Sequence, residues 1–363
     1  MSTPAPPSDA VSLDTPLTPH VDLRWPLLVV ALVALLLLPL VVRHTYLYDD
    51  PGRINDDRLT SPTGWQRLLT EPYNDGVDNL YRPITSYSFA VQAVLFGTDE
   101  SDAWSYHAIN ALLHAGVSVL VAALAFRLMG TSASRAWVAM IAGCLFAMHP
   151  VHAEVVGMVV GRGELLCAVG FLGATLLVLG PLTRGQVVGI VALTLLAIGS
   201  KEQGLVLPAM LGVIFLARRM TGETLSSNGH GKLLAASLLL PLAAYLIFRE
   251  SILPFTWNRG ELDPTIQPFR DATGFDRWAF WLPVLGHALR LLVWPASLSI
   301  DYGTAVIQPP VEVGDPFLWL GVLALLLWTA GVKARSITQA LGTELDRAGR
   351  VVVNADWSIP EHP

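Results

Sequence analysis

The feature that most constrains the fold is a long apolar run without a charged residue, WPLLVVALVALLLLPLVV at 25–42. Its length is close to the roughly 20 residues that an α-helix needs to cross a bilayer. The rest of the chain has the same character, since 53% of its residues are hydrophobic and only 14% are charged, against about 25% charged in soluble domains. These numbers predict an all-α integral membrane protein and exclude a soluble enzyme.

Charge and cysteine content exclude two further classes. A net charge of −6 without a basic stripe gives no footprint for nucleic acid. The two cysteines, Cys144 and Cys167, lie inside apolar runs, where they are expected to be small core residues and not a disulfide or a metal pair.

Apolar segments recur along the chain and predict a polytopic membrane domain over 24–327. Residues 1–23 are rich in Pro, Ser, Thr and Asp, which is typical of a disordered tail. No basic n-region or cleavage site precedes the first run, so we expect it to remain as a membrane anchor. Two longer polar stretches, 44–103 and 250–278, are expected to be loops. About nine membrane segments are predicted: 25–42, about 104–129, 135–149, 164–180, 185–200, 203–217, 232–248, 279–296 and 316–328.

Basic residues in the short connections predict the orientation. With a cytoplasmic N-terminus, the short turns on the outer side carry only Arg162 and Lys201. This orientation places the polar stretches 44–103 and 250–278 outside the cytoplasm. Six basic residues then fall on the cytoplasmic side: Arg127, Arg135, Arg184, Arg218, Arg219 and Lys232.

Several groups of ionisable residues fall on the same predicted outer side. Charges at membrane depth are costly unless they are paired or wetted, so each group is a functional candidate. We expect them to meet in a polar cavity that opens outward. The groups are Asp49 and Asp50; His149, His152 and Glu154 in HPVHAE; Arg162 and Glu164 in GRGE; and Lys201 and Glu202 in SKE.

Such a cavity suits the transfer of a sugar from a lipid phosphate. A carboxylate beside an acceptor hydroxyl can remove its proton as the new bond forms. Asp49 and Asp50 cannot point the same way in an extended segment, so one is expected to face the site while the other orients it. Arg162, Lys201 and His152 are expected to hold the phosphate leaving group and stabilise its charge.

Each group also has a structural explanation. The acidic pair could mark the solvated end of a helix, and SKE could be a plain ion pair. HPVHAE could be a Pro-broken turn whose histidines satisfy backbone groups, or it could bind a metal with Glu154, although no third histidine has suitable spacing. His107, Asn110 and His114, at i, i+3 and i+7 on one helical face, could hold two spans together by hydrogen bonds.

The motifs follow one another in a specific order: YDD, YRPITSYSFAVQAVLFG, HAINALLHAGVSVLV, LFAMHPVHAEVVGMVVGRGELLCAV, GSKEQGLVLP and WPASLSIDYG. This series, over about 45–305, resembles the transmembrane and tetratricopeptide-repeat O-mannosyltransferase family, which belongs to the GT-C class of glycosyltransferases. The resemblance implies a GT-C-like helical bundle with a large first extracytoplasmic loop. It also implies transfer of mannose or a similar sugar from a polyprenyl-phosphate donor, with inversion, to a protein or lipid hydroxyl on the extracytoplasmic side.

The resemblance implies roles for individual residues. Asp49 and Asp50 match the family's acidic pair, where a general base is expected. Arg82 matches its RP element, and Asp301 matches its LS-x-DY motif. The positions that match the donor pocket are Arg82, His107, His149, His152, Glu154, Arg162, Glu164, Lys201, Glu202 and Asp301, and a divalent metal stays open as a cofactor.

The last part of the chain departs from this pattern. Family members usually continue into helical repeats of about 34 residues, which are absent from this chain, so the acceptor stays open. Residues 328–363 are polar and resemble a short internal piece of the type II NADH dehydrogenase family without its glycine-rich nucleotide loops, so we expect a fusion or a frameshift there. This tail leaves an NADH dehydrogenase-like fragment or an inactive remnant as alternatives to a transferase. A non-catalytic membrane transporter or lipid-binding protein is a further alternative, because it would also place charges in a wet cavity.

Overall fold

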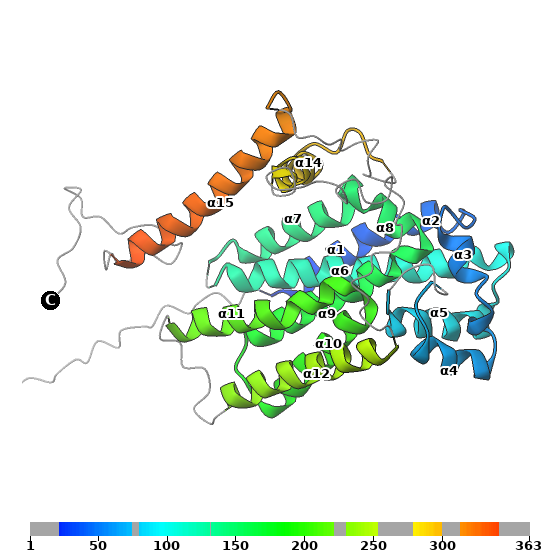
Figure 1. The fold of residues 1–363 in the computed structure, drawn as a ribbon. Coiled ribbons are helices and arrows are strands. Elements are labelled where there is room, and N and C mark those ends of the chain that lie inside the picture. Colours follow the sequence, from blue (N-terminus) through cyan, green and yellow to red (C-terminus); the bar gives the residue numbers. More distant parts are fainter. Residues whose placement is uncertain are drawn as a thin grey trace, which may run out of the picture.

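The computed structural model describes residues 22–74, 80–130, 132–220, 230–252, 279–299 and 313–340 (Figure 1). All regular secondary structure in these ranges is helical, which confirms the predicted all-α class. The predictions for residues 1–21, for most of the 250–278 loop, for Asp301 and for 341–363 lie outside the described residues.

Each of the predicted apolar segments coincides with a helix. The first contains α1 (Arg24–Leu35) and the short α2 (Leu38–Val41). The others contain α6 (Ala103–Leu128), α7 (Arg135–Met148), α9 (Arg162–Val178), α10 (Arg184–Ser200), α11 (Leu207–Met220), α12 (His230–Ile252), α14 (Trp281–Val293) and α15 (Pro316–Ala340).

Among the described residues, fewer helices than the nine predicted spans are long enough to cross a membrane. In the described part of the chain, four stretches are long and apolar enough to cross a membrane, and α7 with the following helix, bent by 48°, would make a fifth. Helices of 13 to 17 residues, such as α14 and α10, reach only about 20–26 Å, less than the ~30 Å of a hydrocarbon core. The structure thus confirms several membrane-capable helices and leaves the count of nine unconfirmed. The four stretches are Arg24–Val41, Glu100–Leu128, Val159–Val178 and Leu233–Ile252.

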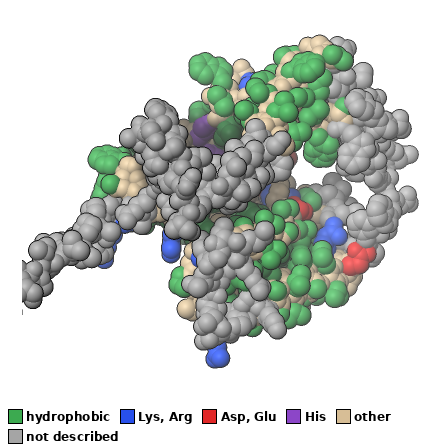
Figure 2. Space-filling model, turned by 90° about the vertical axis from the view of Figure 1, so that its left-hand side faces the viewer, with side chains coloured by type: hydrophobic (Ala, Val, Ile, Leu, Met, Phe, Trp, Pro, Cys, Tyr) green, Lys and Arg blue, Asp and Glu red, His purple; other side chains and the backbone are tan. Residues whose placement is uncertain are grey.

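Small residues bring the first helices together. α1 packs on α6 and α7, and at their contact Val30 and Ala122 are fully buried. A Cβ added at Gly143 would lie only 2.7 Å from Val30 Cγ2, which is the close approach typical of membrane helices. The opposite side of the α1–α2 segment exposes leucines at every fourth position, as expected for a face in lipid. In Figure 2 the coloured part of the surface is mostly hydrophobic, with few charged side chains.

Helices α9 and α10 also pack through glycine and alanine. A Cβ added at Gly170 would lie 2.5 Å from the Leu193 carbonyl oxygen and 2.8 Å from Ala197 Cβ. The backbones of the two helices are therefore in near contact at this point, midway along α9.

Replacing Gly170 by alanine is expected to lower the stability of the protein. The added methyl group would push α10 away, and such overpacking costs about 1–3 kcal/mol. Gly116→Ala in α6 is the matched control, because a Cβ there meets nothing within 4 Å and alanine favours helix by about 0.5–1 kcal/mol. Thermal unfolding in detergent should show a lower midpoint for Gly170→Ala only; equal midpoints would contradict the close contact.

The polar stretch 44–103, predicted as a loop, folds into short helices at one end of the bundle (Figure 1). Their buried apolar residues, including Ile54, Leu59 and Phe89, form a cluster with Tyr106 of α6. This stretch is therefore a small helical cap with its own core. Its elements are α3 (Asp50–Ile54), η1 (Asp57–Leu59), α4 (Pro62–Thr70), α5 (Pro83–Phe96) and η2 (Glu100–Asp102).

The last two helices form a pair. α14 and α15 pack on each other, with Gly286 and Gly321 at the crossing, where an added Cβ would meet the backbone of the other helix. A hydrogen bond of 3.0 Å between His149 Nε2 and the Leu292 carbonyl oxygen joins α14 to the bundle. The boundary predicted at residue 327 falls inside α15, which continues to Ala340.

Candidate functional site

Residues from several of the predicted groups meet around the start of α9. Two short elements, α8 (Ala153–Gly157) and η4 (Val159–Gly161), lead into this helix. Asp50 contacts the segment at Val160, Arg162 is the first residue of α9, and Glu164 in its first turn forms an ion pair with Lys201. One turn of backbone therefore joins Asp50, the GRGE motif and the SKE motif.

The two aspartates have different environments. Asp50 is fully buried, and its carboxylate accepts hydrogen bonds from the backbone N–H groups of Val160 at 2.9 Å and of Leu47 at 3.0 Å. Asp49 is exposed and precedes α3 as its N-cap residue. Tyr48 before it has φ = 48°, a left-handed conformation that is costly for a bulky residue. The backbone is thus held so that one carboxylate is buried while the other faces outward.

The histidine face of α6 binds the backbone of three different segments of the chain. His107 Nε2 lies 3.2 Å from the Thr45 carbonyl oxygen, and His114 Nε2 lies 3.0 Å from that of Ala147. Asn110 Nδ2 donates to the carbonyl oxygens of Met158 at 2.9 Å and of Val159 at 3.2 Å. These buried side chains hold the segments before Asp49 and before Arg162 against the same helix.

Arg162 is a buried cation at the centre of this arrangement. It is 1% exposed, its Nε donates to Asn110 Oδ1 at 3.1 Å, and its Nη2 donates to the Tyr106 carbonyl oxygen at 3.2 Å. Its guanidinium also lies over the ring of Phe89, 4.5 Å from the centroid. No carboxylate forms an ion pair with it in the part of the chain that the structure describes.

The SKE motif does not form an ion pair within itself. Lys201 pairs with Glu164 of α9, whereas Glu202 at the start of η5 (Glu202–Val206) pairs with Arg82. The Arg82 guanidinium approaches both oxygens of Glu202, at 2.7 to 3.1 Å. The RP and SKE elements, predicted to lie in one pocket, therefore meet directly.

The HPVHAE motif forms a bend between α7 and α8. The bend contains η3 (Pro150–His152), with His149 as its N-cap residue. His149 Nδ1 accepts a hydrogen bond from the Val151 N–H at 3.3 Å, and the ring centroid of His152 lies 4.2 Å from that of Phe146. Glu154 is exposed. Among the described residues no three His, Cys, Asp or Glu side chains gather closely enough to hold a metal ion, so these residues do not form the metal site considered as an alternative.

The structure adds residues that the sequence did not single out. In the helical cap, Arg53 and Arg58 are buried and both pair with Asp56, at 3.0 and 2.8 Å. Burial alone would raise the pKa of Asp56, but the hydrogen bonds from Arg58 and the charge of Arg53 lower it. Tyr73 lies against Arg53, with the guanidinium 4.3 Å from the ring centroid. In the sequence these residues are indistinguishable from other charges of a polar loop.

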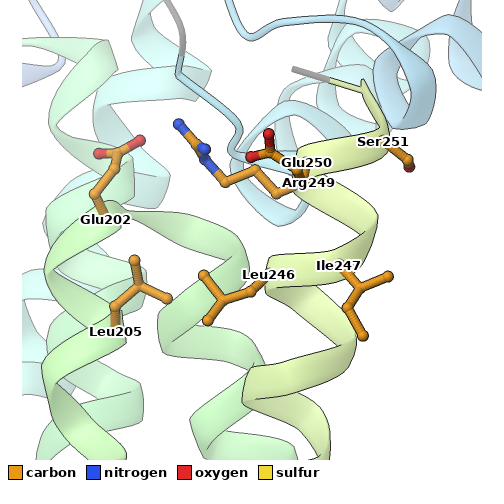
Figure 3. Close-up of a pocket in the computed structure, with 7 residues that line it drawn as sticks. All are labelled: Glu202, Leu205, Leu246, Ile247, Arg249, Glu250 and Ser251. Carbon is orange, nitrogen blue, oxygen red and sulfur yellow. The ribbon is translucent and has the colours of Figure 1, made fainter. Parts of the chain in front are cut away.

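A cavity of about 780 Å³ lies beside the Arg82–Glu202 pair. Figure 3 shows Glu202 and Leu205 on one side and α12 residues on the other, with Leu205 and Leu246 on the same level and the Arg249 side chain extending toward Glu202. One part of the cavity is thus apolar and the other charged. The lining residues are Glu202, Leu205, Leu246, Ile247, Arg249, Glu250 and Ser251.

Curated proteins with similar sequences are named as protein O-mannosyl-transferases. Protein O-mannosyl-transferase TMTC3 of Mus musculus is 31% identical over 342 residues, which cover 82% of this chain and 35% of that protein. F38B6.6 of Caenorhabditis elegans is 35% identical over 266 residues, 72% of this chain and 35% of its own length. For tmtc2 of Xenopus laevis the identity is 34% over 134 residues, 35% of this chain and 15% of the relative.

The matched part of the chain spans about one third or less of the length of these relatives. No family model matches the chain, and no solved structure matches it.

Proposed function

Because the chain belongs to the transmembrane and tetratricopeptide-repeat O-mannosyltransferase family, we propose that it is a membrane glycosyltransferase that transfers mannose from a polyprenyl-phosphate donor to a hydroxyl group. The acceptor is a protein, as the names of the relatives imply, or a lipid. The active site comprises the start of α9, the acidic pair and the Arg82–Glu202 region, on the extracytoplasmic side.

The observation that carries this proposal is the environment of Arg162. A buried cation is costly unless a counter-charge compensates it, and the described partners of Arg162 are an amide and a backbone carbonyl. A phosphate offers the missing negative charge, and its oxygens suit the planar guanidinium. The donor phosphate is therefore assigned to Arg162.

The two aspartates of the acidic pair have different roles. Asp50 uses both carboxylate oxygens to hold the backbone at Leu47 and Val160, so it orients the segment. Asp49 is exposed and takes the role of general base. The strained Tyr48 supports this assignment, since strain in a folded backbone concentrates at functional positions.

The transfer step needs one base and one anion site. Asp49 accepts the proton of the acceptor hydroxyl as its oxygen forms the bond to the anomeric carbon of the sugar. The bond from this carbon to the phosphate oxygen breaks on the opposite face, which inverts the configuration. The electron pair leaves with the polyprenyl phosphate, whose charge Arg162 stabilises.

The cavity between η5 and α12 suits the polyprenyl chain. Its apolar part is formed by Leu205, Leu246 and Ile247, and its charged part begins at Glu202. A lipid with an anionic head has the same division of polarity. On the predicted topology the cavity lies at the outer end of the bundle. Arg218 lies at the opposite end of α9, where it donates to the Gly180 carbonyl oxygen at 3.0 Å. A basic residue at that end agrees with the positive-inside rule.

The experiment that tests the proposal is a transfer assay with membranes that contain the full chain. Radiolabelled polyprenyl-phosphate mannose is supplied, and the label in the protein and lipid fractions is followed. Label above that of membranes without the chain supports the function, and a parallel donor carrying glucose tests the sugar. Equal labelling with and without the chain in both fractions would contradict the proposal.

A further inference from the structure

Tyr73 occupies an unusual position in the helical cap, between two arginines. Its side chain is almost completely buried, and the guanidinium carbons of Arg53 and Arg82 lie 4.3 and 5.0 Å from its ring centroid. Its own carbonyl oxygen accepts a hydrogen bond from Arg58 Nη2 at 3.0 Å, and another from Arg53. Arginine contacts therefore hold both the backbone and the ring of Tyr73 in place.

The hydroxyl of Tyr73 has no acceptor for its proton among the described residues. It is buried and forms no hydrogen bond of good geometry; Arg82 acts on it as a hydrogen-bond donor, but an arginine cannot accept the hydroxyl proton. Two tyrosines of the same region differ: the Tyr81 hydroxyl donates to the Leu69 carbonyl oxygen at 2.9 Å, and that of Tyr87 to Trp65 at 2.7 Å. A buried hydroxyl proton without an acceptor costs free energy and requires a hydrogen-bond acceptor as partner.

The electrostatic surroundings indicate the charge of that partner. The cations of Arg53, Arg82 and Arg162 all act on the Tyr73 phenol: burial raises its pKa, and the three cations lower it in part. Because the pKa stays above its ordinary value, the phenol keeps its proton at neutral pH and can donate it. The Tyr46 hydroxyl is also without a partner, but the charges acting on it are aspartates, which disfavour an anion.

The neighbouring cations are not equally compensated. Arg53 pairs with Asp56, and Arg82 pairs with Glu202, whereas Arg162 has no carboxylate partner in the described ranges. A single anion that binds Arg162 would thus lie in a field that also acts on Tyr73.

We propose that the Tyr73 hydroxyl donates a hydrogen bond to a phosphate oxygen of the lipid donor and fixes the phosphate together with Arg162. The inference rests on the proposed function and names a further contact of that same site. Tyr73 comes from the segment after α4, so the helical cap takes part in donor binding and does not merely cover the bundle.

The test compares Tyr73→Phe with Tyr81→Phe in the full-length protein. A hydrogen bond to a charged group corresponds to roughly a 10- to 150-fold change in affinity. Tyr73→Phe is therefore expected to raise the dissociation constant for polyprenyl phosphate, and the KM for the sugar donor, by at least about tenfold. The phenyl ring keeps its stacking on Arg53, so the midpoint of thermal unfolding without lipid should not fall.

Three outcomes decide the inference. Unchanged affinity of Tyr73→Phe for polyprenyl phosphate overturns it, and so does an equal loss in Tyr81→Phe, because that would reflect a general disturbance of the cap. An equal loss of affinity for polyprenol, which has no phosphate, overturns it as well. If the wild-type protein neither binds polyprenyl phosphate nor transfers sugar, the proposed function itself fails, which is a distinguishable result.

Discussion

The Asp49→Asn variant is expected to insert into the membrane normally and to transfer sugar about 10²- to 10⁴-fold more slowly than the wild type, the range expected for loss of a general base. Asparagine has nearly the same shape but cannot take the proton of the acceptor hydroxyl. Because Asp49 is exposed, the exchange buries no new group and should leave the unfolding midpoint unchanged. Initial rates of mannose transfer, with donor and acceptor in excess, measure the effect.

Two further variants make this result specific. Asp57→Asn is the matched control: its carboxylate is 82% exposed and pairs only at the surface with Arg67, so its rate should equal that of the wild type. Asp50→Asn should lower the free energy of unfolding by about 1–3 kcal/mol. The asparagine NH2 group would replace a carboxylate oxygen that accepts a hydrogen bond from a backbone N–H group, so two donors would face each other. A normal rate in Asp49→Asn, with a lost rate and normal stability in Asp50→Asn, would exchange the two roles.

The helices could be predicted from the sequence, but the number of spans could not. Apolar runs such as 185–200 and 279–296 mark buried or lipid-facing helices well. Hydropathy does not tell a full span from a shorter helix that is tilted or broken, because both bury apolar side chains. The bend at His149 and Pro150 is an example. The apolar helix before the bend and the HPVHAE motif after it form either one broken span or a re-entrant loop, and hydropathy does not distinguish the two.

For the site, the sequence predicted which residues gather but not how they pair. His107, Asn110 and His114 were predicted to share a face, and they do, yet their side-chain nitrogens contact backbone carbonyls, which a sequence pattern does not reveal. Lys201 and Glu202 are neighbours in the sequence but contact different partners. The turn from α10 into η5 decides this by pointing adjacent side chains in different directions, and a pattern of charges does not reveal such a turn.

The same argument explains why the arginines of the helical cap went unnoticed. Arg53 and Tyr73 lie 20 residues apart in a stretch whose composition is typical of a polar loop. Only the fold of the cap, with Phe89 and Tyr106 in its core, brings Arg53 onto the ring of Tyr73 and Arg162 onto the ring of Phe89. A cation that looks solvated in the sequence thus becomes part of a buried cluster.

The Arg162→Met variant is expected to lose donor binding while the free protein keeps or gains stability. In the described structure the Arg162 cation has no carboxylate to compensate its burial. An apolar side chain of similar length therefore removes the cost of the buried charge, which offsets the loss of the hydrogen bonds to Asn110 and Tyr106. With phosphate bound, the same change removes a charged hydrogen-bond partner, worth about 2–5 kcal/mol, or roughly 30- to 4,000-fold in affinity. Binding of polyprenyl phosphate and thermal unfolding in detergent measure the two effects separately.

Arg135→Met provides the matched control for this experiment. Arg135 also lies over an aromatic ring, 4.5 Å from the centroid of Phe126, and donates to a backbone carbonyl, that of Gly130, but it begins α7 on the predicted cytoplasmic side. Its replacement should leave lipid affinity unchanged. A purely structural Arg162 would give the opposite pattern, a lower unfolding midpoint with unchanged affinity for polyprenyl phosphate, and the anion site would then have to be sought elsewhere. A variant that unfolds at the same or a higher temperature but binds the lipid more weakly is the expected result for a residue placed for a ligand. Such a residue destabilises the free protein, and its charge is compensated only in the complex.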